Sequence, residues 1–339
     1  MSRTGGILRD LAGWIPPGLA RAFGRPAALF FHGVEHAITD PRIQRNHHDA
    51  SAFRAIARTL SENFDVLPLA ALGDVLKAPE RHGRALFLMS DDGYANTLGV
   101  AADILEEQRL PWSLFVSTHH IDSGEWNPMT LARLFLFHAP EGLYLLPHID
   151  AVELSGGRDA AAASALRQFK ALDAGRARET LDAMLAVLGP RPLFELTERF
   201  SSERFLNWQE LRELHKRGVA IGAHAEWHWP MNAAQSPDWL RRQARGSRLR
   251  IAEEIGACDA FAYPFGNAGD VSGDAWRAVR DAGYDHAFTT MSGSLDGGAN
   301  PWLLPRYGLA PREPKLPAIV PLLRAGNARL MRWQSRLDG

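Results

Sequence analysis

Two short polar motifs in this sequence have the residue types and spacing for hydrolytic chemistry. Asp91-Asp92-Gly93 directly follows the apolar run 85–89, and His224-Ala-Glu-Trp-His228 directly follows the apolar run 219–223. Two imidazoles and one carboxylate form a good ligand set for a divalent metal such as zinc. The second carboxylate would then be free to act as a base. The two motifs together predict a metal-assisted hydrolase.

Each motif alone has an ordinary explanation. The sequence Asp-Asp-Gly is common in turns, and histidine pairs occur on protein surfaces. The histidine motif is not that of the zincin proteases, because Ala225 stands where a glutamate would follow the first histidine. Two further pairs, His47-His48 and His119-His120, are interpreted as loop histidines near a rim and not as ligands.

The elements that would position these motifs alternate between strand-like and helix-like runs. This alternation predicts a parallel α/β architecture. Helices are expected after the capping residues Asp49, Asn207 and Ser272, and another from Thr97 to about Arg109, before Pro111. Buried strands are expected at residues 27–31, 85–89, 112–116, 219–223, 260–262 and 286–289.

Polar residues follow four of these strands. His32 follows the first strand, Asp91 and Asp92 the second, His224 the fourth, and Tyr263-Pro-Phe-Gly266 the fifth. In a (β/α) barrel the carboxyl ends of the strands share one face, where active sites are built. We therefore expect these groups to converge.

The sequence divides into a central barrel, an insertion within the barrel and a segment at each end. Residues 1–26 form an N-terminal segment, and residues 27–310 form the barrel. A stretch rich in Ala, Arg and Leu at about 129–204 is expected to be a helical insertion. Residues 311–339 are basic and partly apolar. They suit a helix on an anionic membrane surface, or a terminal helix packed on the body.

Composition excludes several classes of protein. The net charge of −1 gives no general attraction to nucleic acid, so no nucleic-acid partner is expected. The lone Cys258 excludes an intramolecular disulfide and a cysteine-based zinc site. No apolar run approaches the ~18 residues of a membrane span, and the first 25 residues lack the apolar core of a secretory signal. We expect a cytoplasmic protein that could also bind peripherally to the inner face of the membrane.

With these motifs in place, the chain resembles the polysaccharide deacetylase family, the NodB-homology domain of carbohydrate esterase family four. Met89-Ser-Asp-Asp-Gly93 is similar to its TFDDG motif, and His224–His228 to its H-[ST]-x-x-H motif. Ala262-Tyr-Pro-Phe265 is similar to R-x-P-[FY], and residues 111–116 and 304–306 to two of its strands. The likeness covers roughly residues 27–126 and 203–310.

The resemblance implies a distorted (β/α)7-type barrel that holds a divalent metal, usually zinc. By matching positions, Asp92, His224 and His228 would be the metal ligands. An N-acylated saccharide would be the substrate.

The remaining roles also follow from the resemblance. Asp91 would be the general base, and the backbone N–H of Phe265 would help to form an oxyanion hole, with Tyr263 beside it at the substrate. Phe31-His32-Gly33 looks like a permuted branch in which the acid histidine comes from the first strand. His286, on the sixth strand, is the second choice of acid.

Three residues depart from the family pattern. Ser90 replaces the Phe of TFDDG, and Ala225 replaces the hydroxyl residue after the first histidine. Ala262 replaces the Arg that orients the base, which leaves the position and pKa of that base open.

The predicted activity is the removal of an N-acetyl or other small N-acyl group from an amino sugar. A cytoplasmic enzyme would act on a glycan or lipid-linked saccharide during surface-polysaccharide synthesis. The alternative is a catalytically silent member of the fold that binds such a sugar. A metal phosphoesterase is less favoured, since it would usually need a second metal and more carboxylates.

Overall fold

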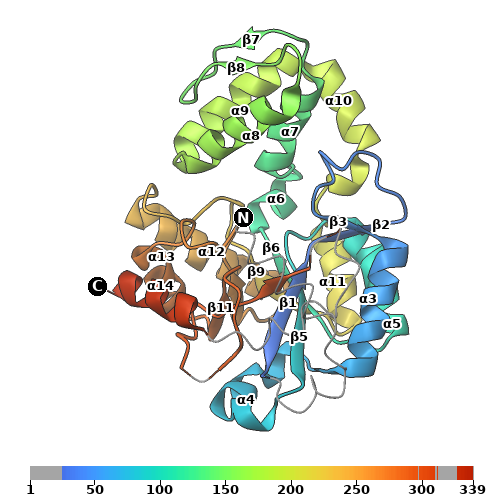
Figure 1. The fold of residues 1–339 in the computed structure, drawn as a ribbon, viewed down its shortest axis with the longest axis vertical. Coiled ribbons are helices and arrows are strands. Elements are labelled where there is room, and N and C mark those ends of the chain that lie inside the picture. Colours follow the sequence, from blue (N-terminus) through green and yellow to red (C-terminus); the bar gives the residue numbers. More distant parts are fainter. Residues whose placement is uncertain (1–24, 297, 310, 312–326, 339) are drawn as a thin grey trace, which may run out of the picture.

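The computed structural model describes residues 25–296, 298–309, 311 and 327–338. Its ribbon shows an α/β body below and a group of helices above it (Figure 1). Most of the predicted N-terminal segment, and residues 312–326 of the C-terminal segment, lie outside the described residues.

A sheet of parallel strands forms the centre of the α/β body. Seven strands follow one another in the order β11-β10-β9-β6-β5-β1-β12, and the short β4 (Asp65–Val66) pairs with β5. The bounds of the seven are β1 Ala27–Phe31, β5 Ala85–Ser90, β6 Ser113–Val116, β9 Ala220–Ala223, β10 Ala260–Ala262, β11 His286–Phe288 and β12 Tyr307–Gly308.

One segment near the C-terminus joins the two edges of this sheet. Leu304 forms a parallel bridge with Phe288 of β11, and Gly308 pairs with Phe30 of β1. The sheet is therefore curled toward closure, which confirms the predicted distorted (β/α) barrel.

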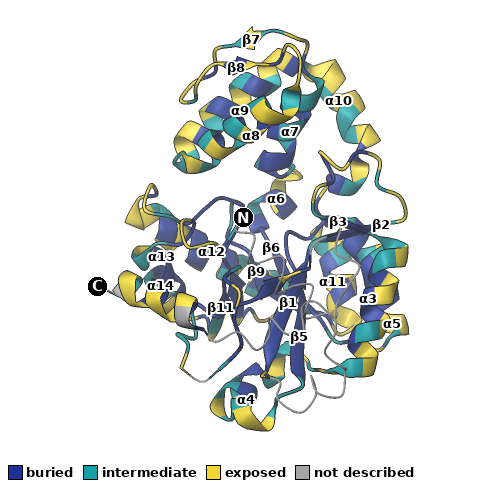
Figure 2. Cartoon of the chain, in the orientation of Figure 1, coloured by how far each residue is buried: buried dark blue, intermediate teal, exposed yellow. Residues whose placement is uncertain are grey.

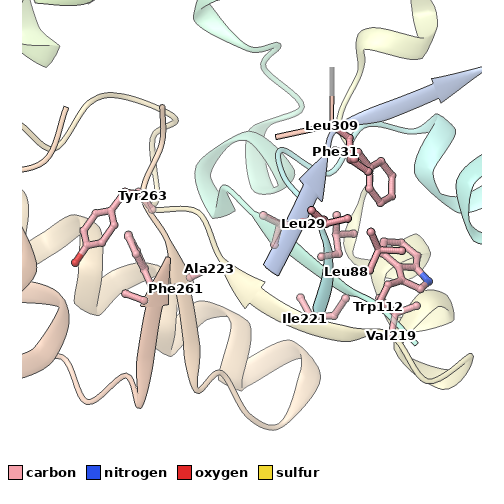
Figure 3. Close-up of a cluster of buried hydrophobic side chains, with 14 of the residues drawn as sticks. Leu29, Phe31, Leu88, Trp112, Val219, Ile221, Ala223, Phe261, Tyr263 and Leu309 are labelled. Carbon is pink, nitrogen blue, oxygen red and sulfur yellow. The ribbon is translucent and has the colours of Figure 1, made fainter. Parts of the chain in front are cut away.

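The strands are apolar because both of their faces are covered. Every residue of β1 and β5 is buried (Figure 2). Leu29, Phe31 and Leu88 point outward under the helices, where they pack with Trp112 (Figure 3). Alternate residues point into the barrel, where Phe30, Phe87, Met89, Phe115 and Phe288 form a second cluster. Burial on both faces explains why these strands read as continuous apolar runs.

Helices cover the outer face of the sheet, and their starts follow the predicted caps. Asp49 caps α3 (Ala50–Asn63), Asn207 caps α11 (Trp208–Lys216) and Ser272 caps α13 (Gly273–Asp281). The α4 helix, Leu72–Lys77, differs, because its Leu72 and Val75 pack with the cluster inside the barrel. Further elements around the sheet are a π-helical turn Thr97–Ala101 continued by α5 Ala102–Glu107, α6 Thr118–Ser123, α12 Pro237–Ile255 and the small β2–β3 pair, Gly33–Glu35 and His47–Asp49.

The stretch between β6 and β9 is mainly helical. Its elements are α7 Pro128–His138, α8 Arg158–Ala171, α9 Ala174–Leu188, α10 Pro190–Arg199 and a hairpin of β7 Leu143–Tyr144 with β8 Val152–Glu153. These helices pack around an apolar cluster that includes Phe135, Phe169 and Leu181. Phe169 contacts Trp229, and the Trp229 indole N–H donates to Leu172 O at 3.0 Å, which fixes the helices over the barrel.

The C-terminal helix α14 (Ala328–Asp338) packs against the body. Leu330 and Trp333 are buried, and the indole of Trp333 donates to Ala268 O at 3.1 Å. Arg332 and Arg336 are exposed. The helix is therefore the terminal helix packed on the body that the sequence offered as one alternative. Contact of residues 311–339 with a membrane stays a proposal. No described helix has the length and apolar character needed to cross a membrane.

Candidate active site

The carboxyl ends of the parallel strands meet at the floor of a pocket of about 670 Å³. His32 follows β1, Asp91 and Asp92 follow β5, His224 follows β9, and Phe265 follows β10; all five line this pocket. The helices of the stretch between β6 and β9 supply the other wall. Sequence periodicity therefore placed these residues at the correct ends of their strands.

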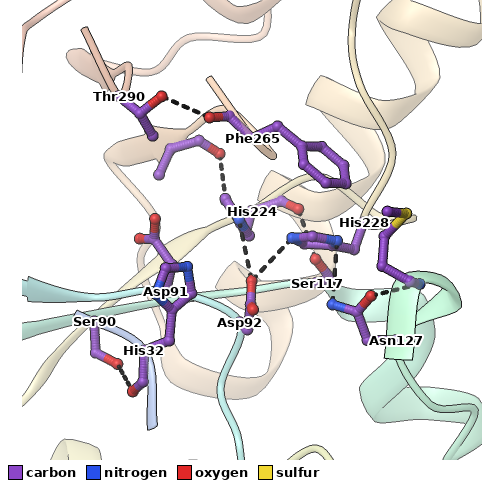
Figure 4. Close-up of polar contacts among 12 residues, drawn as sticks. His32, Ser90, Asp91, Asp92, Ser117, Asn127, His224, His228, Phe265 and Thr290 are labelled. Atoms are coloured by element: carbon purple, nitrogen blue, oxygen red, sulfur yellow. Dashed lines mark hydrogen bonds and ion pairs between the residues drawn. The ribbon is translucent and has the colours of Figure 1, made fainter. Parts of the chain in front are cut away.

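Asp92, His224 and His228 form a buried cluster whose ligand atoms lie within 4.8 Å of one another (Figure 4). Asp92 Oδ1 is 3.4 Å from Nε2 of His224 and 2.9 Å from Nε2 of His228. His224 donates through Nδ1 to the Ala262 carbonyl at 2.7 Å, which leaves Nε2 as the free lone pair.

The chemistry of this cluster fits a divalent cation. Asp92 Oδ1 is buried without a hydrogen-bond donor among the described residues. Burial opposes ionisation of Asp92, but the neighbouring His228 and His224 outweigh it and hold the pKa of this carboxyl well below its usual range. An ionised, unsatisfied oxygen beside two imidazoles is the environment that a metal ion completes.

The backbone is strained where it presents these groups. Asp92, Ala225 and Phe265 have φ of 76°, 64° and 60°, the left-handed region that non-glycine residues rarely adopt. All three stand in the turns that follow a strand and lead into the pocket. Such strain clusters at functional sites, because the surrounding structure must over-determine it.

Neighbouring loops hold the histidine motif in place. Ser117, after β6, donates its hydroxyl to the carbonyl of His224 at 2.7 Å. The buried His120 contacts the amide N of His228 through Nε2 at 3.4 Å. The amide of Asn127, the cap of α7, lies 3.3 Å from Nδ1 of His228. Ser117 supplies a hydroxyl beside the motif, where Ala225 has none.

Asp91 is held by a buried arginine that the sequence motifs did not single out for this role. Arg306 donates from Nη1 and Nη2 to the two Asp91 oxygens at 2.8 and 2.7 Å, and from Nε to Thr289 O. Burial raises the cost of charge on Asp91, but the Arg306 guanidinium outweighs it and lowers the pKa of the carboxyl. Position 262 holds Ala, and the orienting arginine comes instead from the closing segment. The position of Asp91, which Ala262 left open in the sequence, is thus fixed by Arg306.

His32 lies between the acidic pair and the first strand. Its carbonyl accepts from the Ser90 hydroxyl at 2.8 Å, which ties the end of β1 to the end of β5 (Figure 4). Its ring is half-buried and lines the pocket. Burial lowers the pKa of His32, and the nearby carboxylates of Asp92 and Asp91 oppose that shift.

Phe265 and Tyr263 have different surroundings, although they belong to one motif. The Phe265 carbonyl accepts from the Thr290 hydroxyl at 2.6 Å, and its ring packs on His228. No acceptor for the Phe265 N–H exists among the described residues. Tyr263 is fully buried in the outer core, and its hydroxyl donates to Trp302 O at 3.0 Å. Tyr263 thus packs in the core and does not line the pocket, which corrects its predicted place at the substrate.

The other histidines are less exposed than predicted. His47, His48 and His120 are buried, so the interpretation as rim histidines is wrong for these three. Half-exposed His119 stacks on the indole of Trp227. His286 starts β11, at the amino end of the strands, where it lines a different pocket. That position removes it as an alternative acid.

Comparison with known proteins bears on the fold. No family model and no curated protein matches the sequence. Solved structures do match: the deacetylase PplD of Streptococcus pyogenes, in complex with acetate, has 15% identity and a TM-score of 0.56 over 86% of this chain and 95% of its own. This chain has the fold of the polysaccharide deacetylases. IcaB of Ammonifex degensii (15%, TM-score 0.55, 89% and 98% covered) and a de-N-acetylase of Aggregatibacter actinomycetemcomitans (16%, 0.52, 88% and 99%) share the fold.

Proposed function

We propose that this protein is a metal-dependent hydrolase that removes an N-acetyl or other small N-acyl group from an amino sugar. The observation that carries the proposal is the arrangement of two carboxylates with separate partners on one pocket floor. Asp92 faces two imidazoles, and Asp91 faces a guanidinium. One carboxylate is thereby suited to bind a cation and the other to accept a proton.

Asp92, His224 and His228 would hold the metal, for which zinc suits the donor set. When bound there, such an ion supplies a Lewis acid for the acyl carbonyl and lowers the pKa of water. Asp91 accepts the proton of the attacking water, while Arg306 keeps this carboxylate ionised and fixes its plane.

The other groups of the pocket serve the oxyanion and the leaving amine. The Phe265 N–H donates to the oxygen on which negative charge develops. His32 gives a proton to the departing nitrogen, so the products are a small carboxylic acid and a free amino sugar. We further propose a glycan or lipid-linked substrate of surface-polysaccharide synthesis, and a cytoplasmic location.

The test is release of acetate from N-acetylated oligosaccharides by the purified, metal-loaded protein. Asp91→Asn should abolish release, a loss of about 10²–10⁴-fold for a general base, while one metal per chain is retained. A silent sugar-binding member of the fold would bind oligosaccharide and release no acid. Equal loss of metal from the Asp91→Asn and Asp92→Asn proteins would contradict the assigned division of labour.

A further inference from the structure

The pocket above the acidic pair is lined by four basic side chains. Arg45 comes from the loop between β2 and β3, Arg133 from α7, and Arg167 and Lys170 from α8. Three of the four thus stand on the helices between β6 and β9 and not on the barrel. Positive charge from separate elements converges on the same space as Asp91 and the Asp92 cluster.

Three of these side chains have no carboxylate partner among the described residues. No ion pair forms at Arg45, Arg133 or Arg167 within the described ranges, although Arg133 is half-buried. Lys170 differs, since it pairs with Asp270 at 2.8 Å and lies over the Phe265 ring at 4.4 Å. Arg45 and Arg167 are exposed, whereas Arg133 is half-buried. A guanidinium held partly out of water without an anion is costly, which indicates that a ligand supplies the anion at Arg133.

Three arginines of α9 and α10 that do not line the pocket form ion pairs. Arg176 has Asp173, Arg178 has Glu125, and Arg191 has Glu195 at 3.0 Å. Arg158 of α8 and Arg199 of α10 have no carboxylate partner among the described residues, but Arg158 donates to two backbone carbonyls and Arg199 lies over the ring of Phe200. Arg45, Arg133 and Arg167 differ from these five arginines because they line the pocket and have neither a side-chain hydrogen bond nor a ring contact among the described residues.

The acidic groups near the pocket already have other partners. Asp91 is engaged by Arg306, and Asp92 faces the two imidazoles with which it would hold the metal. Glu203, which lies near Arg133, accepts from the Thr130 hydroxyl at 3.0 Å and contacts His47 Nε2 at 3.2 Å. None of these three carboxylates forms an ion pair with Arg45, Arg133 or Arg167.

We propose that the substrate of this pocket is an anionic N-acylated saccharide, whose phosphoryl or carboxylate group is bound by Arg133 together with Arg45 and Arg167. The inference rests on the proposed function and names its substrate class. Guanidinium groups bind both anions through paired N–H donors, and these bonds are stronger than neutral ones. A neutral polymer would leave the half-buried Arg133 without an anionic acceptor.

Matched substrates that differ only in charge test this inference. Acetate release is compared for N-acetylglucosamine 1-phosphate, the methyl glycoside of N-acetylglucosamine and the methyl glycoside of N-acetylglucosaminuronic acid. We expect kcat/KM to be higher for at least one anion than for the neutral glycoside by about 10- to 100-fold, the range for a charge-assisted hydrogen bond. The two anionic arms distinguish phosphoryl from carboxylate.

Variants of the pocket arginines test which side chains cause the preference for an anionic substrate. Arg133→Gln and Arg167→Gln should each lower the ratio of anionic to neutral kcat/KM by about tenfold or more. Arg191→Gln, at an exposed arginine of α10 that does not line the pocket, is the matched control and should leave the ratio unchanged. A ratio near one in the wild-type protein, or equal ratios in all three variants, would overturn the inference while leaving the hydrolase intact.

A binding measurement separates this inference from the proposed activity. The metal-loaded Asp91→Asn protein is titrated with N-acetylglucosamine 1-phosphate and with inorganic phosphate, with and without Arg133→Gln. Binding weakened about tenfold or more by Arg133→Gln supports the anion site even if no substrate is hydrolysed. Binding that is unaffected by Arg133→Gln would refute the proposed site.

Discussion

Removal of the Arg306 charge tests the structural account of the site most directly. The guanidinium is fully buried, makes two hydrogen bonds to Asp91 and lies over the ring of Phe30. Arg306→Gln removes the charge and both paired bonds. Loss of one partner from a buried pair typically costs 3–5 kcal/mol, because the other charge is left uncompensated. Asp91 borders a pocket that water can enter, so we expect the lower end, about 3 kcal/mol.

The same substitution changes the chemistry in a predictable direction. Arg306 lowers the pKa of Asp91, so its removal raises that pKa. A base must be ionised to accept a proton, and the acidic limb of the kcat/KM profile should therefore move to higher pH. Turnover should also fall, because the carboxylate plane is no longer fixed. Acetate release between pH 5 and 9 measures both effects, and metal content should be unchanged.

A double-mutant cycle and a relocated arginine sharpen the experiment. Asp91→Asn, Arg306→Gln and the double variant, compared by urea unfolding at pH 7, should give a coupling free energy of about 2–3 kcal/mol. Ala262 packs with the rings around Arg306 in the barrel interior, so Ala262→Arg added to Arg306→Ala should restore part of the activity. A coupling near zero, or an unshifted pH profile, would refute the claim that Arg306 governs Asp91.

Three further outcomes are expected. Variants His224→Ala and His228→Ala should bind less than 0.1 of the wild-type metal, about a tenfold loss or more, by elemental analysis after dialysis, together with loss of acetate release. His32→Gln should lower turnover about 10²-fold or more, keep its metal and lose the alkaline limb of the rate profile; full activity would show that another group is the acid. Burial lowers the pKa of His48 to about 4. Between this pKa and the ordinary value of about 6.5, the imidazole is protonated in the unfolded chain and neutral in the folded chain. Stability should therefore be full above about pH 6.5 and fall by roughly 3 kcal/mol toward pH 4, and His48→Gln should flatten this slope in urea unfolding.

The sequence by itself determined which ends of which strands carry chemistry. Strands such as Ala85–Ser90 are apolar throughout because both faces are covered, and the first polar residues after them mark the point where the chain reaches the pocket. Parallel pairing then brings these points to one face without further information. The caps Asp49, Asn207 and Ser272 were recognisable because capping depends on neighbouring backbone groups alone.

Only the tertiary structure decided which side chains meet across large separations in the chain. Arg306 reaches Asp91 from 215 residues away, and the motif position expected to supply this guanidinium holds Ala262. The inward or outward direction of Tyr263 depended on the exact register of a three-residue strand, and a shift of one residue reverses the face.

The basic wall of the pocket was also invisible in the sequence. Arg133 and Arg167 stand among many arginines with no distinguishing neighbours, and helix periodicity does not tell which of them has a carboxylate nearby. The fold selects them, because packing of α7 and α8 over the strand ends places these two in the lining of the pocket, whereas Arg176 and Arg191 form ion pairs elsewhere. Local sequence patterns determine helices, strands and their ends. Whether a charged side chain has a partner depends on which residues lie near it in three dimensions, and this requires the folded chain.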